Sequence, residues 1–350
     1  MRVDYLIIGQ GLAGSTLAIE LLRRGRKVVV VDRGDVGSSS RIAAGLITPL
    51  TGKGMNPAWR QREYLDVATQ YYRRLEGESG RRILHSSPVM RFFLTEKERL
   101  KWESKGEGCR EWARDVDVPE DLLKGECYGA IEMQEGAWLD TLAYLEVVRS
   151  RLEEVDAIRR ADFSEEDVCM GVDGVAWQDV TAEKVILCQG AYGLTGVAGY
   201  DGWFSGVSHR SAKGEILSLQ VDGVDEGKRY HGNGWLAPRG DGLWKAGASY
   251  VWDQLDSVPT EVGKEEVLGK LGRWISDDVS LKVVGHEAGI RPIIRNSRPV
   301  VGFHREYPRV GFFNGLGSKG ALMAPAVAAH FAAHLCGECE LDEELSLSDI

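Results

Sequence analysis

The feature that most constrains the fold is a glycine triplet set between two short apolar runs near the N-terminus. Gly9, Gly11 and Gly14 follow the apolar run 3–8, and a second apolar run occupies positions 28–31. Uninterrupted apolar strands are typical of a parallel sheet that is covered on both faces. Between the two runs, apolar residues recur at helical spacing. The order strand, glycine turn, helix and strand therefore predicts a βαβ unit of a doubly wound sheet.

Each glycine of the triplet has its own role in a dinucleotide-binding turn. Gly9 allows the tight turn, Gly11 lets the backbone approach a pyrophosphate, and Gly14 permits close packing of the helix on the strand. The phosphates are then expected to meet unpaired N–H groups in the first helical turn, which includes Leu12 and Ala13. The pattern predicts a dinucleotide at the start of this helix.

An acidic residue stands where the ribose of a dinucleotide is expected. Asp32 lies 18 residues after Gly14, at the end of the second strand, and Arg33 follows it. A carboxylate at this point can accept hydrogen bonds from ribose hydroxyls. Because NAD and FAD share this fingerprint, the choice between the two cofactors depends on other segments.

The order of the remaining predicted elements indicates a second domain within the first. Apolar stripes predict helices at 64–75 and 138–152. Between about 201 and 284 the sequence pattern predicts aromatic-rich strands, with a hairpin turn at 239–242. A strand at 310–313 and an alanine-rich helix return the chain to the first architecture. We expect an α/β fold, α+β overall, in which a Rossmann-type nucleotide-binding domain is interleaved with an antiparallel-sheet substrate domain. The first domain is predicted over residues 1–80, 140–200 and 285–350, and the second over residues 81–139 and 201–284.

The acidic charge balance narrows the class of partner. The chain has 350 residues, with 43 Lys and Arg against 53 Asp and Glu, which gives a formal net charge of −10. Nucleic-acid binders usually display concentrated positive charge, so a small molecule is the expected partner. No apolar run reaches the roughly 18 residues of a membrane span, and six cysteines are too few for a disulfide framework in a chain of this length. We expect a cytoplasmic protein with no membrane partner, and the sequence leaves its oligomeric state open.

A segment of small and hydroxyl residues after the second strand bears on the choice between NAD and FAD. Taken alone, residues 38–45 are compatible with an N-cap followed by a helix. In position and composition, however, the segment resembles the second flavin-contacting segment of the D-amino-acid oxidase superfamily, which includes glycine oxidase and sarcosine oxidase. NAD dehydrogenases have no counterpart. The resemblance implies FAD contacts from Ser40, Arg41, Ala43, Ala44 and Gly45.

Three later segments carry the same resemblance. Residues 289–292 are similar to the superfamily's Gly-x-Arg-Pro segment, whose arginine usually pairs with a substrate carboxylate. Residues 314–320 are similar to the glycine-rich loop that holds the pyrimidine edge of the flavin, and residues 213–217 match a strand at the entry to the substrate domain. Further expected FAD contacts are Val168, Gly190, Gly289, Arg291, Asn314, Gly315, Leu316, Gly317, Ser318, Lys319 and Gly320. Sarcosine oxidases attach flavin through a cysteine in the last region, and none lies between 189 and 335, so we expect non-covalent FAD.

The resemblance implies oxidation of the carbon–nitrogen bond of a small amino acid or secondary amine. Hydride would pass from the substrate to flavin N5, the imine would hydrolyse, and O₂ would reoxidise the flavin to give H₂O₂. Such chemistry depends mainly on positioning and needs no strong base, which agrees with the lack of an obvious triad or acid pair. We expect Arg291 and Lys319 to bind the substrate carboxylate and Tyr250 to stand at the domain junction.

Several alternatives remain open at this stage. His330, His334, Cys336 and Cys339 are four potential zinc ligands, although an alanine-rich helix packed on the sheet and a solvated acidic tail at 338–344 also explain this region, and no metal is assigned. The chain also resembles the oxidase domain of the bifunctional enzyme that modifies the wobble uridine of tRNA, through residues 315–318. A flavin-carrying module without turnover and an NAD dehydrogenase are further possibilities.

Overall fold

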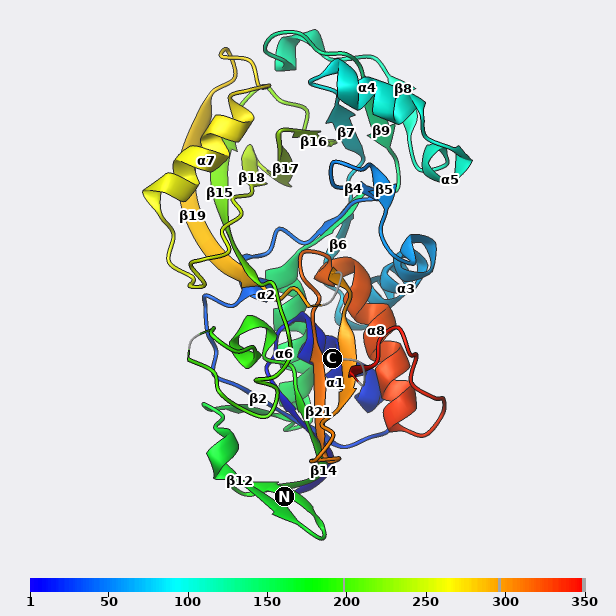
Figure 1. Cartoon of the computed structure of the whole chain (residues 1–350), viewed down its shortest axis with the longest axis vertical. Helices are drawn as coiled ribbons and strands as arrows, with labels where there is room; N and C mark the ends of the chain where they lie inside the picture. The colour runs from blue at the N-terminus through cyan, green and yellow to red at the C-terminus, as the bar shows by residue number, and fades with distance from the viewer. Residues whose placement is uncertain (198, 295–296, 348–350) are drawn as a thin grey trace.

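The computed structural model describes residues 1–197, 199–294 and 297–347. Figure 1 shows two halves along the long axis, a parallel-sheet half that contains the N-terminus and an antiparallel-sheet half beyond it. The helices are α1 (Leu12–Arg23), α2 (Ser39–Ile42), α3 (Gln61–Ser79), α4 (Glu96–Glu103), α5 (Glu107–Arg110), α6 (Thr141–Glu154), α7 (Glu261–Leu271) and α8 (Gly320–Leu335).

The first sheet has a parallel core, as the apolar runs predict. It contains β1 (Arg2–Ile8), β2 (Val28–Asp32), β11 (Ile158–Arg160), β12 (Val168–Gly171), β13 (Gly174–Trp177), β14 (Val180–Leu187), β20 (Val300–Phe303) and β21 (Val310–Asn314). Strands β11, β2, β1, β14 and β21 pair in parallel in that order. Ile7 and Ile186 face one apolar core while Leu6 and Leu187 face another, so both faces of the sheet are covered.

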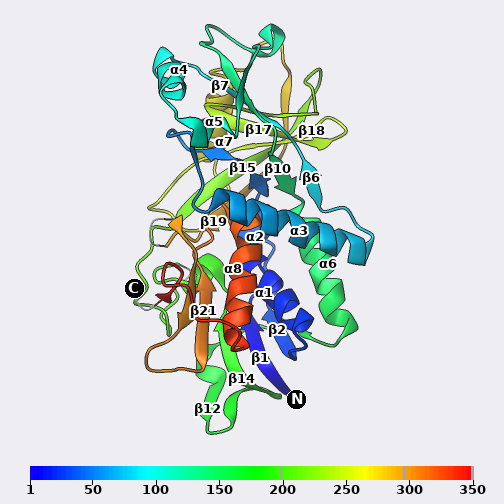
Figure 2. The ribbon, with the colours of Figure 1, turned by 90° about the vertical axis from the view of Figure 1, so that its right-hand side faces the viewer.

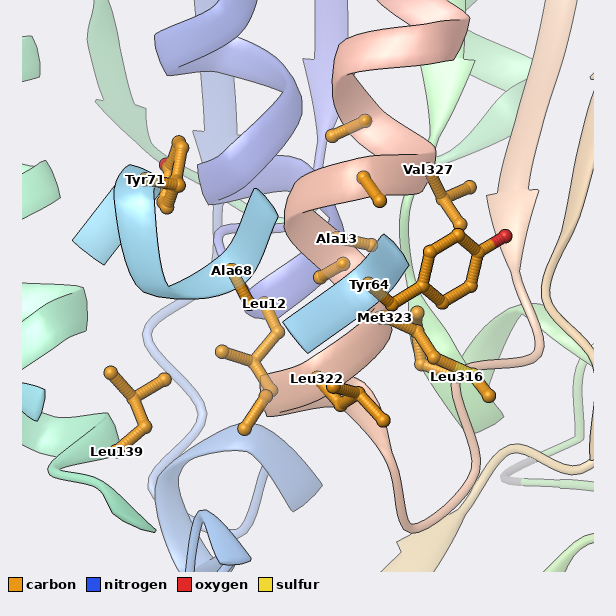
Figure 3. Packing of buried hydrophobic residues seen from close by; sticks show 14 of the residues in the cluster. Leu12, Ala13, Tyr64, Ala68, Tyr71, Leu139, Leu316, Leu322, Met323 and Val327 are labelled. Atoms are coloured by element: carbon orange, nitrogen blue, oxygen red, sulfur yellow. The ribbon is translucent and has the colours of Figure 1, made fainter. Parts of the chain in front are cut away.

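Helices α1, α6 and α8 lie on one face of this sheet, and α3 packs across α8 (Figure 2). Figure 3 shows Tyr64 of α3 beside Met323 and Val327 of α8, and Ala68 of α3 and Ala13 of α1 belong to the same apolar core. This packing confirms the apolar stripe predicted at 64–75. It also fixes the first turn of α1, where the nucleotide is expected.

The second sheet is antiparallel except for one parallel pair. Its order is β19 (Leu281–Arg291), β15 (Ala212–Val221), β18 (Leu243–Gly247), β17 (Gly234–Gly240), β16 (Arg229–Gly232), β7 (Val89–Phe92), β9 (Ala130–Met133) and β8 (Arg114–Val116), with β16 and β7 parallel. The predicted hairpin is the pair β17 and β18, and its turn residues Asp241 and Gly242 have φ of 54° and 70°. Two positive φ values are typical of the type I′ turn that suits the strand twist. The mixed α/β architecture is therefore confirmed.

Five short strands form two further small sheets. β3 (Leu46–Ile47) and β6 (Leu84–Ser86) both pair with β10 (Ala137–Leu139), and β4 (Leu50–Thr51) pairs with β5 (Asn56–Pro57). The helix predicted from Trp138 therefore begins later than expected. Residues 137–139 form a strand, and α6 starts at Thr141 because the Asp140 side chain accepts a hydrogen bond from the N–H of Ala143 at 2.9 Å.

Most of the acidic tail at 338–344 is exposed, as predicted, but its end is anchored to the body of the protein. Arg60 forms ion pairs with Asp342 and Glu344, and Leu345 and Leu347 are buried. The sequence could not show that α3 begins next to this segment. The domain boundaries stay a prediction; strand β19 runs across the expected boundary at 285 as part of the antiparallel sheet.

Candidate cofactor and substrate site

A pocket opens at the carboxyl edge of the parallel sheet and extends to the antiparallel sheet. Strands β1, β2, β14 and β21 all end at this edge, because they run parallel to one another. Ligands of open α/β sheets bind in this position. The lining residues come from the segments 8–13, 31–46, 161–163, 188–192, 214–216, 289–292 and 314–321, with Arg149, Trp235 and Ala248.

The glycine turn has the geometry that its spacing predicts. Gly9 has a φ of +102°, and a β-carbon there would stand 2.7 Å from the carbonyl oxygen of Cys188. A β-carbon at Gly14 would overlap the carbonyl oxygen of Gly9. Gly14 therefore allows the close contact of α1 with the turn and does not line the pocket, whereas Gly11 lines the pocket as the N-cap of α1.

The small-residue segment at 38–45 lies directly against this turn. The hydroxyl oxygen of Ser40 accepts a hydrogen bond from the N–H of Leu12 at 3.0 Å, so the start of α1 and the start of α2 are joined. Gly45 has a φ of +63°, and a β-carbon there would overlap the carbonyl oxygen of Leu139. The other predicted contacts that line the pocket here are Ala13, Arg33, Arg41, Ala43 and Ala44.

Asp32 is oriented by backbone donors at the end of β2. Its carboxylate oxygens accept hydrogen bonds from the N–H of Gln10 at 2.7 Å and of Gly34 at 2.8 Å. The guanidinium of Arg149 lies 3.7 Å from the same carboxylate. The remaining lone pairs of Asp32 face the pocket, where ribose hydroxyls can donate to them.

Asn314 and Gln189 stand at the far end of the sheet edge. The Asn314 side-chain amide donates to the carbonyl oxygen of Gly190 at 2.7 Å and accepts from the N–H of Gly315 at 2.8 Å. The side-chain oxygen of Gln189 is buried and has no hydrogen-bond partner among the described residues, although Gln189 lines the pocket. A buried acceptor of this kind needs a donor, and sugar or ribityl hydroxyls supply one.

These residues fit FAD. The first turn of α1 can hold the pyrophosphate, Asp32 the ribose, and Gln189 a hydroxyl of the ribityl chain. Helix α8 begins at Gly320 without a side-chain cap, and Leu316, Gly317, Ser318 and Gly320 line the same pocket. Its N–H groups can meet the flavin ring.

Arg291 lies at the end of β19, on the wall of the pocket formed by the antiparallel sheet. Its guanidinium packs directly on Gly214, where a β-carbon would overlap it, and lies 4.6 Å from the ring centre of Tyr250. One nitrogen is 3.4 Å from the carbonyl oxygen of Ser249. Burial lowers the pKa of Arg291. Within the described residues no carboxylate pairs with Arg291, so its fork can receive an anionic ligand.

Four other predicted site residues do not line the pocket. Tyr250 is 39% exposed beside Arg291, and Lys319 is the N-cap of α8, where burial lowers its pKa. Gly315 lies behind the lining, because a β-carbon there would stand 2.9 Å from the carbonyl oxygen of Arg298. Val168 is the first residue of β12 and pairs with β13.

Sequence reasoning missed two parts of the lining. Residues 161–163, which follow the edge strand β11, line the pocket, whereas Val168 does not. The polar three-residue strand Ile158–Arg160 gave no strand signal. The sequence also did not predict that Arg149 of α6 lines the pocket. Its guanidinium lies close to Asp32, and nothing in the sequence around Arg149 marks this contact.

The four potential zinc ligands do not converge on one point, although Cys339 Sγ lies 3.9 Å from His330 Nδ1. His330 Nε2 accepts from the N–H of Asp342 at 2.9 Å, His334 Nδ1 lies 3.0 Å from the carbonyl oxygen of Cys339, and Arg26 Nε lies 3.3 Å from Cys336 Sγ. No cluster of potential metal ligands occurs in the part of the chain that the structure describes.

Among residues 1–197, 199–294 and 297–347, no helix is both long and apolar enough to span a membrane.

The fold and the pocket define a class of protein that binds a dinucleotide between a parallel sheet and an antiparallel sheet. The profile of the FAD dependent oxidoreductase family, DAO, matches residues 4–334, and the chain belongs to this family of enzymes. FAD is accordingly its cofactor.

Known relatives match over the whole chain. Glycine oxidase of Bacillus licheniformis is 26% identical over 351 residues, which cover 96% of this chain and 94% of that protein. The tRNA 5-methylaminomethyl-2-thiouridine biosynthesis bifunctional protein MnmC of Marinobacter nauticus is 24% identical, over 95% of this chain and 55% of that protein. The crystal structure of glycine oxidase from Geobacillus kaustophilus superposes with a TM-score of 0.81 at 18% identity, over 99% of this chain and 98% of that one.

Proposed function

We propose that this protein oxidises the carbon–nitrogen bond of an amino acid or of a secondary amine that carries a carboxylate. The observation that carries the proposal is the guanidinium of Arg291, which is buried in the pocket wall without a carboxylate partner in the described chain. The similarity to glycine oxidase supports the same class of substrate. When bound, FAD supplies the oxidising power, since it accepts two electrons as hydride and returns them to an acceptor such as O₂, which becomes H₂O₂.

The chain itself binds and orients the substrate. Arg291 presents two parallel N–H donors to the carboxylate, and Gly214 leaves the space in which the guanidinium lies flat. Tyr250 covers the other face of the guanidinium. A carboxylate held in this way fixes the direction of the adjacent Cα–H bond, which accounts for much of the rate in a reaction that depends on positioning.

Apolar groups from the antiparallel sheet exclude water beside this fork. Ile216, Trp235 and Ala248 pack together against the pocket. A dry wall strengthens the charge-assisted bonds of Arg291 and favours the neutral form of the amine, whose lone pair helps to expel the hydride.

Lys319 is proposed as a second cationic contact for the carboxylate, which a movement of the Lys319 side chain would bring within reach. Lys319 is the N-cap of α8, and burial lowers its pKa.

The decisive experiment is anaerobic mixing of the purified flavoprotein with a panel of amino acids and secondary amines while the flavin spectrum is recorded. We expect bleaching by carboxylate-bearing amines, and half-saturation at a concentration about 10–100-fold higher in Arg291→Gln, since charge-assisted hydrogen bonds contribute about 1.5–3 kcal/mol. Arg210→Gln is the matched control, because Arg210 also lies over an aromatic ring, that of Trp252, and does not line the pocket. Equal half-saturation for parent and Arg291→Gln would contradict the proposal.

Oxidation of a modified tRNA uridine is the second candidate, because MnmC is among the relatives. The chain spans only 55% of that protein, and its net charge of −10 disfavours capture of a polyanion. Salt-sensitive binding of tRNA by the purified protein would favour this candidate, and absence of binding at low salt would remove it.

A further inference from the structure

Three arginines on neighbouring strands of the antiparallel sheet converge on one segment of the nucleotide-binding half. Arg239 of β17 donates to the carbonyl oxygen of Ala44 at 2.7 Å, and Arg229 of β16 donates to that of Ile47 at 2.7 Å. Arg91 of β7 donates to the carbonyl oxygen of Gly52 at 2.9 Å. Together with His231 of β16, these residues are called the arginine cluster below.

The register of the strands places the cluster on one face of the sheet. His231 is in register with Arg91 of β7, and Arg229 is two residues earlier on β16, so the three side chains share a face. Val89, which is in register with Arg229, packs in the core that includes the helices of the nucleotide-binding half. The cluster therefore faces that half of the molecule.

The positive charge of the cluster is largely buried, and the carboxylates that attract it, Glu98 for Arg91 and Asp140 for Arg239, form no ion pair with it in the described chain. Arg229 and Arg91 are 2% and 5% exposed, and none of the described ion pairs includes a member of the cluster. Burial first, and repulsion from Arg239 second, lower the pKa of Arg229 to about 9. Burial, then Arg91 and Arg229, lower the pKa of His231 to about 3, so His231 is neutral.

Part of the hydrogen-bonding capacity of the cluster is also unused. The Nε of Arg229 and the Nδ1 of His231 are buried without a partner among the described residues. Carbonyl oxygens of one segment satisfy some of the donors, but they do not neutralise charge. A buried, uncompensated charge is costly, whereas an anion bound among the guanidinium groups removes most of that cost.

The cluster adjoins the pocket that holds the proposed substrate. Ala44, Leu46 and Trp235 line that pocket. Arg239 donates a hydrogen bond to the carbonyl oxygen of Ala44. His231 is in register with Trp235 on the neighbouring strand, and neighbouring strands lie about 4.8 Å apart. Arg291, the expected partner of the α-carboxylate, stands at the end of the edge strand β19, whereas the cluster lies on β17, β16 and β7, the fourth to sixth strands of the same sheet.

We propose that the arginine cluster is a subsite for a second anionic group, and that the substrate is an amino acid or secondary amine whose side chain or N-substituent ends in a carboxylate. The inference rests on the proposed function for the reaction at the carbon–nitrogen bond. It adds the specificity of that reaction, because one carboxylate binds Arg291 and the other binds the cluster. The separation of the two sites favours a substrate longer than aspartate.

The test compares acids with their amides in a series of increasing length. Glutamate and glutamine, 2-aminoadipate and its side-chain amide, and the N-carboxyalkyl glycines and their amides are each mixed anaerobically with the holoenzyme. We expect the acid to exceed its amide at least tenfold in the second-order rate constant of flavin reduction for at least one length. Equal rate constants for acid and amide at every length would overturn the inference, while the proposed function would stand because both reduce the flavin.

Arg91→Gln separates a binding role from a structural one. Glutamine can still donate to the carbonyl oxygen of Gly52, but it carries no charge. We expect the acid-to-amide ratio to fall at least fivefold in this variant. Arg62→Gln is the matched control, because Arg62 is an exposed arginine that lies over Trp112 and pairs with Glu135, and its ratio should not change. An unchanged ratio in Arg91→Gln would mean that the cluster only holds the segment at 44–52.

A binding measurement keeps the two proposals distinguishable if no amine reduces the flavin. Glutarate and adipate, with their monoamides, are titrated into the holoenzyme while the flavin absorbance is followed. Tighter binding of the diacids in the parent than in Arg91→Gln supports the subsite without any turnover. Equal binding of diacid and monoamide overturns it.

Discussion

The guanidinium of Arg291 lies so close to Gly214 that a β-carbon at Gly214 would overlap its nitrogen atoms. This relationship explains why a glycine stands between Lys213 and Glu215 near the start of an otherwise well-formed strand, β15. Lys213 is buried and pairs with Asp256, and the Glu215 carboxylate accepts from the N–H of Thr260 at 2.8 Å, so both neighbours hold the strand in place. Gly214 leaves the space above the strand to the arginine.

Gly214→Ala should therefore displace Arg291 without disturbing the cofactor. We expect the KM for carboxylate-bearing amines to rise about 10–100-fold, which corresponds to the loss of one charge-assisted contact of about 1.5–3 kcal/mol. The flavin content after gel filtration should equal that of the parent, since the FAD contacts lie on other strands. Steady-state kinetics over the substrate panel check the prediction, and an unchanged KM would show that Arg291 tolerates the methyl group.

The ribose contact offers a test of cofactor binding alone. Asp32→Asn keeps one acceptor oxygen but removes the charge and one of the two acceptors that hold the N–H groups of Gln10 and Gly34. We expect the dissociation constant of FAD to rise about tenfold, in line with a lost charged hydrogen bond. Asp4→Asn is the control, because Asp4 likewise accepts from a backbone N–H, that of Lys27, and lies outside the pocket. Fluorescence titration of each apoprotein with FAD measures the two dissociation constants.

The nucleotide half could be predicted from the sequence because its signals are local. The glycine turn, Asp32 and the strands on either side lie within one βαβ unit, where each residue type has one physical role. The resemblance to a flavoprotein family then supplied segments such as 38–45 and 314–320, most of whose residues line the pocket.

The substrate half could be predicted only in outline, because its contacts join distant strands. The clash of Gly214 with Arg291 and the convergence of Arg91 and Arg229 on one segment depend on the register of strands far apart in the chain. No local pattern marks such pairs. Residues 161–163 line the pocket and Val168 does not, and the short polar strand before residues 161–163 has no apolar signal of its own.

The third glycine of the turn should be a packing residue. A β-carbon at Gly14 would overlap the carbonyl oxygen of Gly9, so Gly14→Ala must separate α1 from the turn, and we expect the free energy of unfolding to fall by about 1–3 kcal/mol. Gly77→Ala is the matched control in helix α3, because nothing lies within 4 Å of its β-carbon position. That change should raise the free energy of unfolding by up to about 1 kcal/mol. Urea denaturation measures the free energy of unfolding of both apoprotein variants. Similar changes in that free energy for Gly14→Ala and Gly77→Ala would contradict the prediction.

His231 should make stability depend on pH in a specific direction. Its pKa is about 3 in the folded protein against an ordinary value of 6.5, because burial and the neighbouring arginines disfavour the charged ring. Between these values the unfolded chain binds a proton that the folded chain does not, so stability falls as the pH falls below 6.5, by at most about 1.4 kcal/mol for each pH unit. His231→Gln removes this proton. We expect the parent to lose more stability than His231→Gln between pH 6.5 and pH 5, measured by urea denaturation at each pH, whereas His304→Gln, a change outside the arginine cluster, should leave the pH dependence of the parent in place. Parallel curves for the parent and His231→Gln would show that the ring beside Arg91 and Arg229 takes up its proton as readily as in the unfolded chain.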